Sequence, residues 1–182
     1  MNLPFKLETT LEEKIAADPE WQEGAVWGKP RSGHPEGQVL QHIAEVLANV
    51  DRFAIDAEDR RALRIIALIH DTFKSRVKPL LPAVGENHHA MLARRFAERY
   101  IDDPALLDII ELHDAAYHCW RAGARWGNWA KAGEYADQLI ARLGPSLPRY
   151  VRFFRADNRT GDKDQAPLAW FEDYVQQQGI QV

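Results

Sequence analysis

Apolar residues recur at intervals of three and four along almost the whole chain, and this spacing is the strongest constraint on its fold. Leucine, isoleucine, valine and alanine at such intervals form one apolar stripe along a helix. Val39, Ile43, Val46 and Val50 are one example. No stretch shows the sustained two-residue alternation of a half-buried strand. The sequence therefore predicts an all-α fold, an irregular bundle of several helices.

Capping residues, prolines and glycines set the expected helix ends. Thr10 with Glu13 is typical of a capping box. Asp56 is typical of an N-cap, and Asp103 is typical of an N-cap that is followed by a proline in the first turn. Two segments are predicted loops, the Pro/Gly-rich "KPLLPAVGEN" (78–87) and "RAGARWGNW" (121–129). Helices are expected at about 10–18, 36–51, 56–70, 87–101, 103–117, 128–143, 148–157 and 167–178.

Length and composition favour one globular domain over residues 1–182. Hydrophobic residues make up 46% of the chain and charged residues 27%, enough to bury a core. The net charge of -4 argues against an extended nucleic-acid surface. The single cysteine, Cys119, cannot form an internal disulfide and fits a reducing compartment. With neither a signal peptide nor a membrane-length apolar run, we expect a cytoplasmic protein without a membrane segment.

Four of the predicted helices each carry a histidine on or beside the apolar stripe, namely His42, His70, His89 and His113. A lone buried histidine is usually bonded to a backbone carbonyl. Four on separate helices, with Asp71 directly after His70, are hard to explain by packing. Neutral imidazoles and a carboxylate around a divalent cation make such burial tolerable. Asp71 also follows a helix C-terminus, which favours a cation. The pattern predicts a metal site.

The order of these residues, continued by Asp157, resembles the HD-domain metal-dependent phosphohydrolases, all-α proteins named for an adjacent His-Asp pair. The nearest resemblance is to the HD domain of bacterial tRNA nucleotidyltransferases. The segments that carry it are "HPEGQVLQHIAEVLANVD", "LIHDTFK", "HAMLARRFA" and "RADNRTGDK". The resemblance covers about 34–163, with short helical extensions on either side. Phe73 replaces a common glycine, so the loop after the pair is expected to differ in shape. No nucleotidyltransferase catalytic segment precedes this region, so we do not expect a tRNA-modifying enzyme.

The resemblance implies a set of metal ligands. His42, His70, Asp71 and Asp157 would hold one ion, and His89 and His113 would hold a second ion or face the substrate. Neighbouring His88 makes the third histidine position ambiguous. His89 is preferred because it matches both the apolar stripe and the family offsets, which leaves His88 as a candidate substrate contact. Mixed nitrogen and oxygen donors suit Mn, Fe, Co, Ni or Zn better than Mg.

The implied chemistry is hydrolysis of a phosphate ester. A bound metal lowers the pKa of water from near 16 to about 7 and polarises the phosphoryl oxygen. Asp71 could bind the metal and also orient that water. Lys74, Arg155 and Arg159 are candidates for neutralising the phosphate. The alternative for each is a solvated surface charge, which is favoured for the two arginines but not for Lys74. We expect hydrolysis of a small phosphomonoester or phosphodiester, with a nucleotide favoured as the substrate.

Other functions remain open from the sequence. The same fold could serve as a non-hydrolytic nucleotide-binding sensor, although an intact ligand set argues against that role. A di-iron oxygenase would use the same ligands, and a redox-active di-iron spectrum would favour it. Cys119 beside His118 is a poor candidate nucleophile because no residue nearby in sequence would orient the thiol. The substrate, the metal and the oligomeric state are not fixed by the sequence.

Overall fold

Helices account for the regular structure of the protein, as the sequence predicts. The computed structural model describes residues 1–181, apart from the side chain of Trp126, and within that range the only strand-like pairing is an isolated bridge between Arg31 and His34. The α-helices are α1 (Thr10–Ala17), α2 (Pro19–Ala25), α3 (Val39–Val50), α4 (Ala57–Ile69), α5 (His89–Ala97), α6 (Pro104–Leu112), α7 (Ala115–Trp126), α8 (Trp129–Leu143), α9 (Leu147–Asn158) and α10 (Ala166–Gln177). Short 3₁₀ turns cover Lys74–Arg76, Gly85–Asn87 and Gly144–Ser146.

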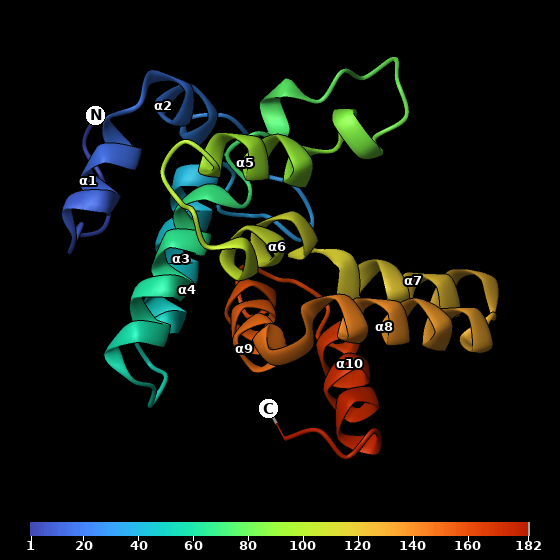
Figure 1. The fold of residues 1–182 in the computed structure, drawn as a ribbon. Helices are drawn as coiled ribbons and strands as arrows, with labels where there is room; N and C mark the ends of the chain where they lie inside the picture. Colours follow the sequence, from blue (N-terminus) through green and yellow to red (C-terminus); the bar gives the residue numbers. More distant parts are fainter. Residues whose placement is uncertain (182) are drawn as a thin grey trace.

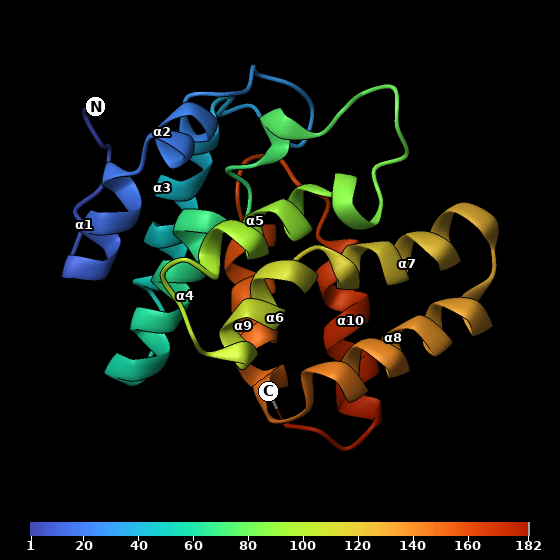
Figure 2. The ribbon, with the colours of Figure 1, turned by 45° about the horizontal axis from the view of Figure 1, so that its top comes forward.

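Helix α4 lies beside α3 (Figure 1), and it also packs against α9, α6 and α1. Every residue from Ala62 to Ile69 is buried, and this run includes Arg64. The guanidinium of Arg64 is held by Glu12 on α1, with Nε donating to Oε1 at 2.8 Å and Nη2 donating to Oε2 at 3.0 Å. On the other side, α7 and α8 form an antiparallel pair that α10 contacts (Figures 1 and 2).

Several predicted helix starts are confirmed by their caps. The side chain of Asp56 accepts hydrogen bonds from the backbone of Glu58 and Asp59, and Asp103 caps α6 ahead of Pro104. The first helix is capped one residue earlier than predicted, because Thr9 rather than Thr10 accepts the bond. Short polar side chains at these positions satisfy amide groups that have no partner within the helix.

The structure corrects three expectations about helix boundaries. Helix α2 was not predicted, because Pro19 reads as the end of α1, whereas it forms the first turn of a new helix capped by Asp18. The predicted loop 121–129 is wrong, since α7 continues through Gly123 to Trp126. A Cβ at Gly123 would lie 2.2 Å from the ring of Trp129, so this glycine permits close packing between α7 and α8. The expected helix 103–117 is divided at residues 113–114 into α6 and α7.

Candidate metal centre

The turn that carries Asp71 is held in place by α2. His70 is the C-terminal cap of α4, and Asp71 follows it directly. The indole Nε1 of Trp21 donates to the carbonyl of Leu68 at 2.6 Å. Gly24 lies so close to the turn that a Cβ there would be 1.8 Å from the carbonyl oxygen of Thr72. Packing against α2 therefore fixes where Asp71 lies.

The carboxylate of Asp71 lies between two pairs of histidines. Its Oδ2 atom is 3.6 Å from the Nε2 atoms of both His42 and His70. Its Oδ1 atom is 3.4 Å from Nε2 of His113 and 3.5 Å from Nε2 of His89. Within each pair the Nε2 atoms lie close together, 3.3 Å apart for the first and 3.2 Å for the second. The four histidines and Asp71 thus form two groups of potential ligands that share one carboxylate.

Asp157 joins the first pair from α9. Its Oδ1 atom is 2.8 Å from Nε2 of His42 and 3.6 Å from Nε2 of His70. The amide of Asn49 on α3 donates to the carbonyls of Ala156 and Arg159, at 2.9 and 3.1 Å. These two bonds fix the end of α9 against α3, and so hold Asp157 beside His42.

The hydrogen bonds of two of the rings show that lone pairs point into this group. Nδ1 of His70 donates to the carbonyl of Ala67 at 3.0 Å, and Nδ1 of His113 donates to that of Ile110 at 2.9 Å. A neutral imidazole protonated at Nδ1 carries its lone pair on Nε2. The facing Oδ1 of Asp71 is buried and has no hydrogen-bond donor among the described residues. Lone pairs of Nε2 and Oδ1 that converge without a donor between them are suited to binding a divalent cation. The carbonyls of Ala67 and Ile110 hold the two rings in the orientation that such binding needs.

The charge states of Asp71 and His89 also suit metal binding. Burial by itself would raise the pKa of Asp71, but Lys74 and the neighbouring imidazoles hold it well below its usual range. The pKa of His89 is lowered to about 3, first by burial and then by His113. A carboxylate and a neutral imidazole are the forms that bind metal ions.

Comparison with protein families matches residues 39–137 to the HD domain, which is more than half of the chain. The chain belongs to the HD domain family. This family is part of the metal-dependent phosphohydrolase superfamily and binds divalent metal ions. The matched segment contains the four histidines and Asp71, whereas Asp157 lies beyond it. The narrower resemblance to the HD domain of tRNA nucleotidyltransferases stays a prediction.

No curated protein and no solved structure matches the chain. Among the described residues of this HD domain, no helix is both long and apolar enough to span a membrane.

Behind the HD-domain histidines, Glu36 contacts the far nitrogen of His42. Nδ1 of His42 lies 3.2 Å from Oε1 of Glu36, and Nδ1 of His34 is hydrogen-bonded to the same oxygen at 2.9 Å. Burial opposes ionisation, yet the neighbouring imidazoles of His42 and His34 lower the pKa of Glu36 to about 2. A carboxylate in this position orients the imidazole ring. Sequence reasoning gave no role to His34 or Glu36, although both lie in the segment "HPEGQ" that carries the resemblance.

A cleft of about 390 Å³ opens over the group, and two lysines lie in it. Nζ of Lys74 donates to Oδ2 of Asp71 at 2.5 Å. Nζ of Lys163 donates to both Oδ1 and the carbonyl of Asp157, at 2.9 and 3.0 Å. Lys74 was expected from the sequence, whereas Lys163 was missed although it ends the segment "RADNRTGDK".

The structure does not bring Arg155 and Arg159 to the cleft. Arg155 donates from Nε to Glu172 on α10 at 2.7 Å, and Arg159 is exposed at the end of α9. Neither residue lines the cleft beside Asp157. The expectation rested on their distance of two residues from Asp157, but side chains two residues apart on a helix point in very different directions. Lys163 is the cation that contacts Asp157 instead.

The two adjacent histidines face different partners. Nδ1 of His88 accepts the amide hydrogen of Ala90 at 3.3 Å and so caps α5. In the neutral ring Nε2 of His88 then carries the proton, and it lies 3.5 Å from Oδ2 of Asp114. His89 instead faces His113 and Asp71. This geometry favours His89 over His88 as a metal ligand, and it does not place His88 in the lining of the cleft.

Proposed function

We propose that this HD domain is a metal-dependent phosphohydrolase that cleaves a small phosphomonoester or phosphodiester, with a nucleotide as the favoured substrate. One observation carries the proposal. The carboxylate of Asp71 lies between two histidine pairs, and its buried Oδ1 has no hydrogen-bond donor among the described residues. Such an arrangement is costly without a cation, because a buried acceptor loses its bonds to water.

Two ion positions follow from the ligand groups. One would be held by His42, His70, Asp71 and Asp157, and the other by Asp71, His89 and His113. Their nitrogen and oxygen donors suit Mn, Fe, Co, Ni or Zn. When bound, such an ion polarises a phosphoryl oxygen and lowers the pKa of water.

The lysines of the cleft supply positive charge for the phosphate. Lys74 and Lys163 each donate to a carboxylate, and their ammonium groups line the same cleft. An ammonium group has three donor hydrogens, so each lysine can keep its carboxylate and still donate to a phosphate oxygen. Asp71 would orient the attacking water as well as holding metal.

The size of the cleft supports a small substrate. A volume of about 390 Å³ lies within the range of small-molecule sites. A chain of net charge -4 offers two lysines here rather than a long basic surface. These features favour a small ester over a nucleic-acid polymer.

The test compares purified wild type with Asp71→Asn, which keeps the side-chain shape and removes the charge. We expect the wild type, loaded with Mn²⁺, Co²⁺ or Zn²⁺, to release phosphate from p-nitrophenyl phosphate, from its diester or from members of a nucleotide panel. Chelation and the substitution should each lower the rate at least about a hundredfold. Asp173→Asn makes the same change at an exposed position on α10 and should retain the rate. Equal rates in wild type and Asp71→Asn would contradict the proposal.

A further inference from the structure

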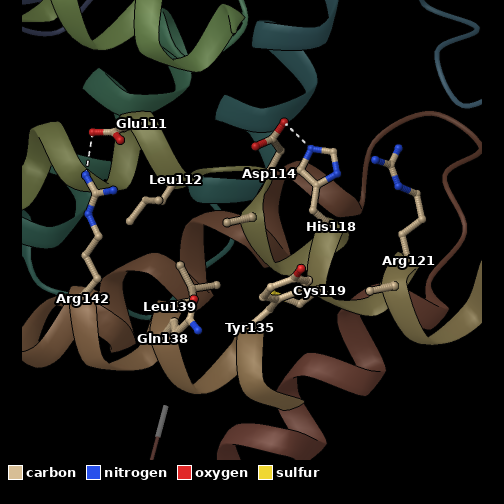
Figure 3. A pocket seen from close by; sticks show the side chains of 12 residues that line it. Glu111, Leu112, Asp114, His118, Cys119, Arg121, Tyr135, Gln138, Leu139 and Arg142 are labelled. Carbon is tan, nitrogen blue, oxygen red and sulfur yellow. Dashed lines mark hydrogen bonds and ion pairs between the residues drawn. The ribbon is translucent and has the colours of Figure 1, made fainter. Parts of the chain in front are cut away.

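One face of α7 leads away from the metal centre and carries polar side chains. Asp114 precedes the helix, and His118 and Arg121 follow it at intervals of four and three residues. This spacing places the three side chains on one side of a helix, and Figure 3 shows them in a row along α7. Nε2 of His118 is hydrogen-bonded to Oδ2 of Asp114 at 3.1 Å.

A groove of about 570 Å³ follows this face between α7 and α8. Tyr135 and Gln138 line it from α8, and Arg121 lines it from α7 (Figure 3). Asp114 and His118 line both this groove and the cleft over the metal centre. A molecule bound in the cleft could therefore extend along α7 into the groove.

The acidic end of the groove is already neutralised. Nη2 of Arg142 donates to Glu111 at 2.6 Å and to Asp108 at 3.3 Å. Arg94 binds the same two carboxylates. The two carboxylates and the two guanidinium groups thus neutralise one another. The charge of Arg142 is therefore already paired within the protein.

Arg121 differs from Arg142 because its charge is not balanced by a direct contact. Over the described part of the chain, no carboxylate lies within 4.0 Å of its guanidinium nitrogens. The guanidinium lies over the ring of Tyr117, 5.6 Å from the ring centre. That contact holds the side chain without consuming its hydrogen-bond donors.

We propose that the groove binds the leaving group of the substrate, and that Arg121 binds a second anionic group on it. The substrate class is then a phosphate ester with a further negative charge beyond the scissile phosphate. Arg121 lies seven positions after Asp114, which corresponds to roughly 10 Å along a helix. This inference rests on the proposed function, because it places the scissile phosphate over Asp71 and the lysines.

The test measures binding rather than turnover. Two non-hydrolysable alkylphosphonates are titrated calorimetrically into the metal-loaded protein, with chains that span roughly 10 Å. One ends in a carboxylate and the other in the neutral primary amide. We expect the wild type to bind the carboxylate about three- to tenfold more tightly, since an exposed charge pair contributes modestly. Arg121→Ala should remove this preference. Arg61→Ala, which deletes an exposed arginine on α4, should keep it.

The outcomes separate this inference from the proposed function. Equal binding of the two ligands to the wild type, or a carboxylate preference that persists in Arg121→Ala, would overturn the role of Arg121. If neither phosphonate binds and no phosphate ester is hydrolysed, the proposed function itself fails. The proposed leaving-group site would then be excluded as well.

Discussion

The Nε2 atoms of His42 and His70 lie 3.3 Å apart in the interior of the protein. They come from α3 and α4, and His70 presents a lone pair because its Nδ1 donates to a carbonyl. Asp71 and Asp157 both approach the same two nitrogens. A cation between these four side chains would satisfy all of them at once, and the predictions for Lys74, Gly24 and metal binding depend on that interpretation.

Replacement of Lys74 by alanine should weaken catalysis without removing metal. Its ammonium group lines the cleft and contacts Asp71 without belonging to the ligand set. We expect kcat/KM for a small phosphate ester to fall about tenfold, since one charge-assisted hydrogen bond to phosphate is lost. Lys78→Ala, at an exposed position, is the matched control. Loss of metal from Lys74→Ala would show that the residue is structural, and unchanged kinetics would remove it from the site.

Alanine at Gly24 should impair the metal centre from outside the ligand set. The new Cβ would overlap the carbonyl of Thr72 and displace the turn that carries Asp71. We expect metal affinity to fall about tenfold and stability to fall by about 1–3 kcal/mol. Glycine to alanine inside a helix ordinarily stabilises, so a loss would be informative. Glu23→Ala, at the exposed neighbouring position, should change neither quantity appreciably. Wild-type affinity in Gly24→Ala would mean that α2 does not fix the turn.

The buried pair between Arg64 and Glu12 should contribute to stability rather than to activity. Both side chains are almost inaccessible to solvent, and Glu12→Ala would remove the buried carboxylate to which Nε and Nη2 of Arg64 donate. We expect the free energy of unfolding in urea to fall by about 3–5 kcal/mol. Glu8→Ala removes a carboxylate on the partly exposed side of the same cluster and should cost about 1 kcal/mol or less. Similar losses in the two variants would contradict this account.

Cys119 should react slowly with alkylating agents at neutral pH. Burial raises the pKa of its thiol to about 11, so the protonated form dominates below that value and the reactive thiolate appears only as the pH rises. The rate of iodoacetamide labelling in the folded protein is expected to keep rising between pH 8 and pH 10. An unperturbed thiol, with a pKa near about 8.5, would approach its plateau in that interval. Rapid labelling at pH 7 would show an activated thiol and reopen its candidacy as a nucleophile.

The sequence predicted those parts of the site that depend on local helical periodicity. His42, His70 and His113 follow from their positions on apolar stripes, and the structure brings them together around Asp71. Lys163 could not be predicted in this way, because it returns to Asp157 through a turn at Gly161, whose φ is 54°. A turn of this kind depends on tertiary contacts rather than on periodicity.

The errors have related causes. Arg155 was placed at the site because it is near Asp157 in sequence, whereas its direction on α9 leads it to Glu172. Gly123 was interpreted as a loop residue, although the packing of Trp129 makes a glycine favourable inside α7. In both cases the residue that determines the local structure, Glu172 or Trp129, lies on another helix. The sequence around Arg155 or Gly123 therefore does not reveal it.

The most direct test of the central claim is the binding of metal to the wild type and to Asp71→Asn. The purified apoprotein is titrated with Mn²⁺, Co²⁺ and Zn²⁺, and the bound ions per chain are determined by elemental analysis. Because Asp71 belongs to both ligand groups, the account predicts up to two ions per wild-type chain and weakened binding at both positions in the variant. A wild type that binds none of these ions, or an Asp71→Asn variant that binds them as tightly as the wild type, would contradict it.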